Sequence, residues 1–316
     1  MSEKNQKIYV AGHRGLVGSA ILRTLKANGY TNILTCTHAE LDLTRQQEVE
    51  SFFAHEKPQW VFLSAARVGG IMANSTYPAD FIYQNLMIST NIIHAAYLSG
   101  VSKLLNLGSS CIYPKLAPQP LKEEFLLSGP LEPTNEAYAL AKIAAIRLCK
   151  HYNDQYGTDF ISAMPTNMYG PGDNFDLQSS HVLPAMIRKF HEAKITGKPI
   201  LLWGDGSPFR EFLFADDLAN ALVFLMENTS YVDIGEFINV GSGVEITIKD
   251  LACLVAKVVG YAGPIQWDSS KPNGTPRKLM DSGRLFARGW HPSVDIESGL
   301  QQTYDWFLAN YPKDDN

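Results

Sequence analysis

Short apolar runs alternate with longer stretches of mixed polarity along the first half of the chain. A run such as 60–66 has the length and composition of a buried strand, whereas 80–100 repeats apolar residues at helical spacing. Strands are predicted at 7–12, 32–37, 60–66, 103–110 and 159–165, and helices at 15–29, 45–58, 80–100 and 132–157. This alternation predicts an α/β fold, in which a doubly wound parallel sheet carries helices on both faces.

The pattern changes after residue 165, where loops rich in Gly, Pro and Asn separate helices predicted at 181–194 and 216–228. In open α/β sheets, ligands bind beyond the carboxyl ends of the strands. We therefore expect a first domain over 1–165 and a smaller lobe formed mainly by 166–316. The lobe should lie against that edge of the sheet, with some of its segments returning to the first domain.

Composition and charge narrow the class of protein. A net charge of −5 gives no basic field, which argues against nucleic-acid binding. The cysteines are scattered without metal-ligand spacing, so no metal site is expected and a reducing compartment is indicated. The first residues lead directly into a strand, and no apolar run reaches membrane-spanning length. We expect a cytoplasmic protein without a membrane partner.

A glycine-rich turn joins the first predicted strand to the first predicted helix. In GHRGLVG, glycines recur at every third position, and this placement is typical of the dinucleotide-binding turn of a Rossmann-type domain. Three glycines at such a turn can also be purely structural. The predicted cofactor contacts here are Gly12, His13, Arg14, Gly15, Leu16, Val17 and Gly18.

The choice between NAD and NADP depends on the end of the second strand. NAD enzymes usually carry an acid there for the ribose hydroxyls, but this strand ends in TCTH, with no carboxylate before Glu40. Arg14 is either a partner for a 2′-phosphate or a solvated loop arginine. Asp42 either meets the adenine ring or caps the following helix. The balance favours NADP(H) as the cofactor.

Candidate chemistry appears in GSSCIYP, 108–114, and in YALAK, 138–142. Tyr138 and Lys142 share one helix face, and a nearby cation is expected to lower the pKa of a phenol. Ser109 follows a predicted strand, where it can bind a substrate carbonyl while Tyr138 exchanges a proton with that oxygen. A serine-rich turn and a surface helix pair are the plainer alternatives.

These motifs together resemble the extended short-chain dehydrogenase/reductase family. The similarity is greatest to its epimerase–reductases that act on GDP-4-keto-6-deoxymannose. It also includes AARVGGIMANSTYPADFIYQN, MPTNMYGPGDNF, REFLFADD and KPNGTPRKL, so that it spans nearly the whole chain. The resemblance implies epimerisation at C3 and C5 of the sugar, followed by NADPH-dependent reduction of the C4 ketone.

The resemblance also implies roles for single residues. Cys111 matches the proposed base and His181 the proposed acid of the epimerisation, although alone they would be a buried thiol and a helix-start histidine. Ser109, Tyr138 and Lys142 match the ketone-reducing trio. Further cofactor contacts are implied for His38, Asp42, Leu107, Gly108, Ser110, Lys142, Pro165, Thr166, Asn167, Met168 and His181.

The resemblance also suggests residues that bind the substrate, although fewer of them match the family pattern. Arg210 resembles a diphosphate clamp, Trp203 lies in the substrate loop, and Lys189 is a third candidate contact, although arginine and tryptophan are common in such places. Two positions depart from the family pattern. His38 stands where relatives place an arginine near the 2′-phosphate, and Asn273 stands where an aspartate is usual.

Two rival functions are weighed against this one. A nucleotide-sugar 4-epimerase or dehydratase would retain its NAD, but a 4-epimerase needs no thiol at Cys111, and a dehydratase usually carries an acid beside the serine. A non-catalytic sensor of dinucleotide would not need Tyr138 or Lys142, and both are present. The long helices 80–100 and 132–157 suggest a homodimer face.

Overall fold

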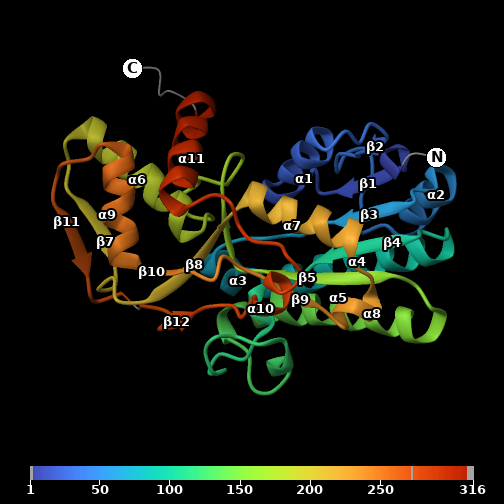
Figure 1. Ribbon diagram of the computed structural model, residues 1–316. Coiled ribbons are helices and arrows are strands. Elements are labelled where there is room, and N and C mark those ends of the chain that lie inside the picture. The colour runs from blue at the N-terminus through green and yellow to red at the C-terminus, as the bar shows by residue number, and fades with distance from the viewer. Residues whose placement is uncertain (1–2, 272, 312–316) are drawn as a thin grey trace.

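A six-stranded parallel sheet forms the centre of the first half of the chain (Figure 1). Its order is β2-β1-β3-β4-β5-β9, and every neighbouring pair runs parallel. The strands are β1 (Ile8–Ala11), β2 (Ile33–Leu34), β3 (Trp60–Leu63), β4 (Lys103–Leu107), β5 (Phe160–Pro165) and β9 (Ile238–Val240). The predicted doubly wound α/β sheet is confirmed, and β9 is a segment from the second half of the chain.

Helices cover both faces of this sheet, because its strands are apolar on both sides. On one face, α1 (Leu16–Ala27) packs against α7 (Ala215–Asn228). On the other lie α2 (Gln46–Glu56), α4 (Pro78–Leu98) and α5 (Glu136–Tyr156). None of the helices in the described part of the chain is long and apolar enough to cross a membrane.

The structure, a computed structural model, describes residues 3–271 and 273–311. Residues 1–2, 272 and 312–316 lie outside the described residues. They include the first two residues of the predicted first domain, the last five of the predicted lobe and the proline of KPNGTPRKL.

Some boundaries differ from the predicted ones for local reasons. The strand predicted at 103–110 ends at Leu107, because the Ser109 hydroxyl accepts a hydrogen bond from the Cys111 N–H and starts the 3₁₀ turn η2 (Ser110–Ile112). The helix predicted at 132–157 starts with a 3₁₀ turn, η4 (Pro133–Asn135), and its α-helical part begins at Glu136. A short helix, α3 (Ile71–Thr76), was not predicted.

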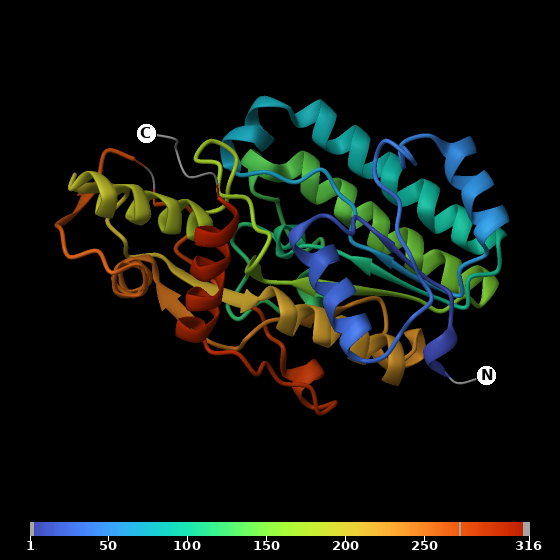
Figure 2. The ribbon, with the colours of Figure 1, turned by 90° about the horizontal axis from the view of Figure 1, so that it is seen from above.

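The second half builds a separate lobe beside the main sheet (Figure 2). Helices α6 (Val182–Thr196), α9 (Ile248–Val259) and α11 (Ile296–Asn310) share its apolar core. One small sheet pairs β7 (Ile200–Trp203) with β11 (Ile265–Asp268). In another, β8 (Phe209–Phe214) pairs with β6 (Asn167–Tyr169), β10 (Glu245–Thr247) and β12 (Arg277–Lys278). The remaining short elements are η1 (Glu3–Asn5), η3 (Glu123–Phe125), α8 (Tyr231–Ile234) and α10 (Gly283–Phe286).

A buried carboxylate on β8 joins these parts. Glu211 has no exposed surface, and its two carboxylate oxygens accept hydrogen bonds from the Gly243 N–H (2.8 Å) and the Met280 N–H (2.9 Å). Its backbone carbonyl accepts a third from the Asn167 side-chain amide (2.8 Å). Glu211 therefore ties the chain after β5, the loop after β9 and the chain after β12 to one strand.

We predict that Glu211→Gln lowers the free energy of unfolding by about 1–3 kcal/mol, because the new amide NH₂ would face a backbone N–H that has lost its acceptor. Urea denaturation measures this. Glu297→Gln is the matched control, since Glu297 forms an exposed ion pair with Lys257 and should leave stability unchanged. Equal unfolding midpoints for the two variants would contradict the role given to Glu211.

Candidate active site

The glycine-rich turn is built for close backbone approach. Gly12 has a φ of +84°, and a side chain there would come within 2.7 Å of the Ala65 backbone. A side chain at Gly18 would overlap the carbonyl oxygen of Gly12. Gly15 precedes the first residue of α1, no side chain caps this helix, and its first turn holds no acid. Open N–H groups at a helix start suit a phosphate, so the cradle fits the pyrophosphate of a dinucleotide.

Beside this turn lies Glu40, which was not predicted as a contact and whose carboxylate is affected by the charges of Arg14 and His13. Glu40 accepts a hydrogen bond from the Thr37 N–H at 2.7 Å. That bond, together with the charges of Arg14 and His13, lowers the pKa of Glu40. Arg14 is exposed and therefore accessible to a ligand, and its charge also acts on the Glu40 carboxylate. The position of Glu40 near the first loop depends on the tertiary structure, so the sequence pattern alone does not predict it.

The two other residues predicted near the adenine end lie together. The His38 ring is largely exposed, and its Nδ1 is 3.9 Å from a carboxylate oxygen of Asp42. Asp42 accepts hydrogen bonds from the Thr44 N–H (2.9 Å) and hydroxyl (2.8 Å). Asp42 therefore caps the turn before α2, while the residue at the start of that helix is Arg45.

The predicted contacts after β4 and β5 lie at adjacent strand ends. The Lys142 ammonium donates a hydrogen bond to the Leu107 carbonyl at 2.7 Å, which fixes α5 on the end of β4. A side chain at Gly108 would overlap the sulfur of Met164 on β5, so a larger residue here would force the end of the Met164 side chain to move. After β5 come the predicted contacts Pro165, Thr166, Asn167 and Met168, the last two within β6.

Ser109, Tyr138 and Lys142 converge at the end of β4. The Lys142 ammonium lies 5.8 Å from the centre of the Tyr138 ring. Burial raises the pKa of Tyr138, and a hydrogen bond with Ser109 opposes this rise only in part. Burial also lowers the pKa of Lys142 to about 8. The expectation that the phenol has a lowered pKa is wrong, because burial raises the pKa, and Tyr138 is a protonated donor at neutral pH.

Cys111 and His181 belong to two different elements, and the charge of Lys278 affects the pKa of both. Cys111 is buried in η2, next to Ser110, and this burial raises the pKa of its thiol. The charge of Lys278 is the largest effect that opposes the rise. His181 stands at the start of α6, where partial removal from water and the charge of Lys278 lower the pKa of its ring.

Lys278 is the residue in this cluster that the sequence argument missed. It lies on β12, directly beside Arg210 of β8 in the parallel register. It belongs to KPNGTPRKL, which contributed to the resemblance, but nothing in that stretch distinguishes Lys278 from its charged neighbours. Only the pairing of β12 with β8 brings it to the thiol.

The predicted substrate residues lie further out on the second lobe. Arg210 donates a hydrogen bond to its neighbour's carbonyl, that of Phe209, at 2.7 Å. Removal from water lowers the pKa of both Arg210 and Lys189, and no ion pair joins either to a carboxylate of the described residues. Trp203 is exposed at the end of β7, with the Lys271 ammonium 5.7 Å from its ring centre.

Asn273 has a structural partner in the substrate loop. Its side-chain oxygen accepts a hydrogen bond from the Asp205 N–H at 2.9 Å and so closes the loop that follows Trp203. An amide or a carboxylate could accept this bond equally. Its contact with a substrate stays a prediction.

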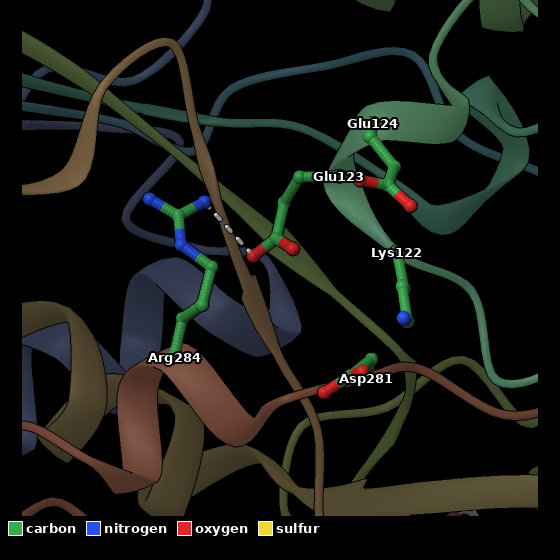
Figure 3. A pocket seen from close by; sticks show the side chains of 5 residues that line it. All are labelled: Lys122, Glu123, Glu124, Asp281 and Arg284. Carbon is green, nitrogen blue, oxygen red and sulfur yellow. Dashed lines mark ion pairs between the residues drawn. The ribbon is translucent and has the colours of Figure 1, made fainter.

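A separate hollow lies between the region of η3 and the chain that leads into α10 (Figure 3). It holds about 320 Å³, and Arg284 pairs with Glu123 across it at 3.3 Å. Its lining is entirely charged and shares no residue with the cluster around Cys111: Lys122, Glu123, Glu124, Asp281 and Arg284. Nor do the described residues contain a group of three or more His, Cys, Asp or Glu side chains that could hold a metal ion.

Comparison with known proteins supplies the family. GDP-L-fucose synthase 1 of Arabidopsis thaliana is 61% identical over 311 residues, covering 98% of this chain and 95% of that protein. GDP-L-fucose synthase of Escherichia coli K12 is 55% identical over 312 residues, with 96% and 97% covered. A GDP-mannoheptose C4 reductase from Campylobacter jejuni, solved with NADP bound, superposes with a TM-score of 0.90 at 39% identity, covering 98% of this chain and 100% of that one. Residues 8–241 match the NAD dependent epimerase/dehydratase family, and the chain belongs to that family.

Proposed function

We propose that this chain converts GDP-4-keto-6-deoxy-D-mannose into GDP-L-fucose, by epimerisation at C3 and C5 followed by NADPH-dependent reduction at C4. One observation carries the proposal. Groups suited to two reactions, the Ser109–Tyr138–Lys142 trio and the Cys111 thiol, converge at the end of β4, and His181 and Cys111 are both affected by the charge of Lys278. Relatives named for this activity are 55–61% identical over nearly the whole chain.

The cofactor site follows from the glycine-rich turn. The N–H groups at the start of α1 would hold the pyrophosphate of NADP(H), with the loops after β4 and β5 on either side of the nicotinamide. Arg14 and His38 are the cations available to the 2′-phosphate. When bound, NADPH supplies the hydride that reduces C4.

Reduction needs a proton for the oxygen of the former ketone. Tyr138 carries one at neutral pH, because burial raises the pKa of its phenol. Ser109 is placed to hydrogen-bond the same oxygen and orient it. Lys142 is held on the Leu107 carbonyl, so its charge stays fixed beside the Tyr138 ring.

Epimerisation needs a base and an acid on opposite faces of the sugar ring. Protons beside the C4 ketone are acidic because the resulting enolate spreads its charge onto the oxygen, which the reducing trio already binds. Cys111 would take the proton, and His181 would return one from the other face. The lowered pKa of His181 makes its protonated ring a readier donor.

The second lobe would hold the GDP end of the substrate. Arg210 and Lys189 have no carboxylate partner in an ion pair among the described residues, and both are partly buried, so a diphosphate would supply the missing negative charge. Trp203 offers an exposed aromatic face in the same lobe. A cytoplasmic location is part of the proposal and is consistent with four free cysteines.

The direct test supplies GDP-4-keto-6-deoxymannose with NADPH and then with NADH, follows cofactor oxidation at 340 nm, and identifies the sugar by NMR. Formation of GDP-L-fucose, with higher kcat/KM for NADPH, is the expected outcome. Absence of oxidation with either cofactor would refute the function, and equal kcat/KM would refute the cofactor preference alone.

Tyr138→Phe should lower kcat by roughly 10²–10⁴-fold with little change in KM, because general acid catalysis is lost while binding contacts remain. Steady-state kinetics measure this. Tyr156→Phe, an exposed tyrosine at the end of the same helix, is the control and should match the unaltered enzyme. If kcat of Tyr138→Phe stays near normal, Tyr138 is only a packing residue.

Cys111→Ala should stop the exchange of the C3 and C5 protons with solvent deuterium, because the base is gone. Hydride transfer should survive in part and slowly give the unepimerised GDP-6-deoxy sugar, since the reducing trio is intact. NMR of the sugar in D₂O follows both events. Cys253→Ala, at an exposed cysteine on α9, serves as the control. Normal GDP-L-fucose formation by Cys111→Ala would show that this thiol is not the base.

A homodimer through α4 and α5 is also proposed, because both helices expose large apolar side chains: Tyr83 (60%), Leu98 (59%) and Leu140 (42%). Sedimentation at micromolar concentration should give twice the chain mass of 35.0 kDa. Leu140→Glu should shift it towards the monomer, whereas Val232→Glu, exposed on α8, should not. A monomeric mass for the unaltered chain would exclude the dimer.

A further inference from the structure

Asn239 is a buried polar residue to which the proposed chemistry gives no role. It lies on β9 at the edge of the main sheet, pairs there with Met164 of β5, and has no exposed surface. A buried amide needs partners for its oxygen and its NH₂ group, because an unpaired one costs free energy. Both groups of Asn239 have partners, and these come from parts of the chain that are distant in sequence.

The side-chain oxygen of Asn239 accepts a hydrogen bond from the Tyr113 hydroxyl at 2.6 Å. Tyr113 is 4% exposed, and burial raises the pKa of its phenol, so the hydroxyl keeps its proton and acts as the donor. Tyr113 directly follows η2, the turn that contains Cys111. The hydrogen bond therefore joins β9 to the far end of the loop that starts at Ser109.

The NH₂ group of Asn239 binds two further segments. It donates to the carbonyl of Leu121 at 2.9 Å and to that of Asp281 at 3.2 Å. These segments are also joined to each other, because the Asp281 N–H donates to the Leu121 carbonyl at 2.8 Å. One amide thus connects the loop of Cys111 with two other parts of the chain, and a carboxylate in its place could donate neither bond.

The backbone of Asn239 extends this network to the charged hollow. Its N–H donates to a carboxylate oxygen of Glu123 at 3.1 Å. The same carboxylate pairs with Arg284 at 3.3 Å (Figure 3). Asn239 is therefore held at its backbone as well as at its NH₂ group, so it offers Tyr113 an acceptor in a fixed position.

The loop from Ser109 to Tyr113 is held differently at its two ends. Ser109 stands two residues after β4, and its hydroxyl accepts the Cys111 N–H at 3.4 Å. At the other end, Ile112 and Tyr113 pack into an apolar cluster that includes Phe237. Apolar packing is not directional, whereas a hydrogen bond is. The Tyr113 hydroxyl is thus a directional restraint on the chain that follows Cys111.

We propose that Tyr113 and Asn239 are positioning residues for the epimerisation: their hydrogen bond holds the η2 turn so that Cys111 reaches the C3 and C5 protons of the sugar. This inference rests on the proposed epimerase function. Ser109 precedes the turn and is closer to the end of β4, so the reducing trio depends less on this bond. In this role both residues act through Cys111 and need no contact with the substrate.

The experiment compares Tyr113→Phe with Tyr30→Phe in the full chain. Both tyrosines are 4% exposed, and the Tyr30 hydroxyl donates to a carboxylate oxygen of Glu227 at 2.8 Å. Tyr30 precedes β2, so in this parallel sheet it lies at the edge opposite the end of β4. Each variant therefore loses one hydroxyl hydrogen bond from a buried ring, but only Tyr113→Phe loses it beside η2.

Alkylation of the cysteines by iodoacetamide, followed by mass spectrometry, reports on the turn without any substrate. Cys111 and Cys149 are buried and Cys253 is exposed, so Cys253 gives a reference rate within each molecule. Tyr113→Phe should raise the relative rate at Cys111 about fivefold, as expected for the loss of one buried hydrogen bond, while Cys149 stays protected. Tyr30→Phe should change neither. A general loss of stability would raise the rate at Cys149 as well.

Proton exchange at C3 and C5 in D₂O gives the functional readout. Tyr113→Phe should exchange about tenfold more slowly, because misplacing a reacting group by about 1 Å can cost roughly 100-fold. The KM for the GDP-sugar should stay nearly unchanged. Added to Cys111→Ala, Tyr113→Phe should not slow the remaining hydride transfer further, since a residue that acts through the thiol has no effect once the thiol is gone.

Asn239→Asp tests the other partner of the bond. The new carboxylate could still accept from Tyr113, but it would face the carbonyls of Leu121 and Asp281 without a hydrogen to donate. It should therefore slow exchange and raise the alkylation of Cys111 at least as much as Tyr113→Phe does. If this variant fails to fold, the milder Tyr113→Phe decides the question alone.

Two results would overturn the inference. Exchange at the normal rate in Tyr113→Phe would show that the turn does not need this bond to place the base. A further loss of hydride transfer when Tyr113→Phe is added to Cys111→Ala would show that the bond supports the whole site and not the thiol. If the unaltered chain exchanges no sugar protons, the proposed function fails, and the alkylation rates still decide whether the bond holds the turn.

Discussion

Hydrogen bonds of Glu211 connect segments that the candidate site needs in one place. Its carboxylate binds the N–H groups of Gly243 and Met280, and its carbonyl binds the side chain of Asn167. These segments leave β9, β12 and β5, so one buried residue sets the second lobe against the main sheet. Because the partners of its buried carboxylate are backbone groups, their positions tolerate little change. The distance between the lobe's cations and the thiol after β4 depends on this junction.

The site itself is short of negative charge. Lys189, Arg210 and Lys278 gather in the second lobe with lowered pKa values, although the whole chain carries a net charge of −5. Removal from water causes each shift, and a bound diphosphate would reverse part of it. Cations buried without carboxylate partners cost free energy of folding, and they favour the binding of an anion. The negative charge of a bound diphosphate would therefore compensate the positive charge of these side chains.

One short loop can serve two reactions because its residues are small. Ser109 starts the turn after β4 by accepting the Cys111 N–H, which places a hydroxyl and a thiol two residues apart at the same strand end. Gly108 lets this loop pass against Met164, and Lys142 ties it to α5. Larger side chains would separate the proposed reducing groups from the proposed base. Reduction and epimerisation at neighbouring carbons require these groups to lie close together.

The sequence by itself determined the parallel sheet, the helices on its two faces, the glycine-rich turn and the spacing of Tyr138 and Lys142. These features depend on apolar periodicity and on residues close together in the chain, so local physics is enough to predict them. The strands of the second lobe are short and pair across long stretches of chain, and they were not predicted. Only the tertiary structure brought Lys278 to Cys111 and Glu40 to Arg14, because strand pairing and loop packing decide such meetings. It also reversed the expected pKa shift of Tyr138, since burial is a property of the folded chain and not of a motif.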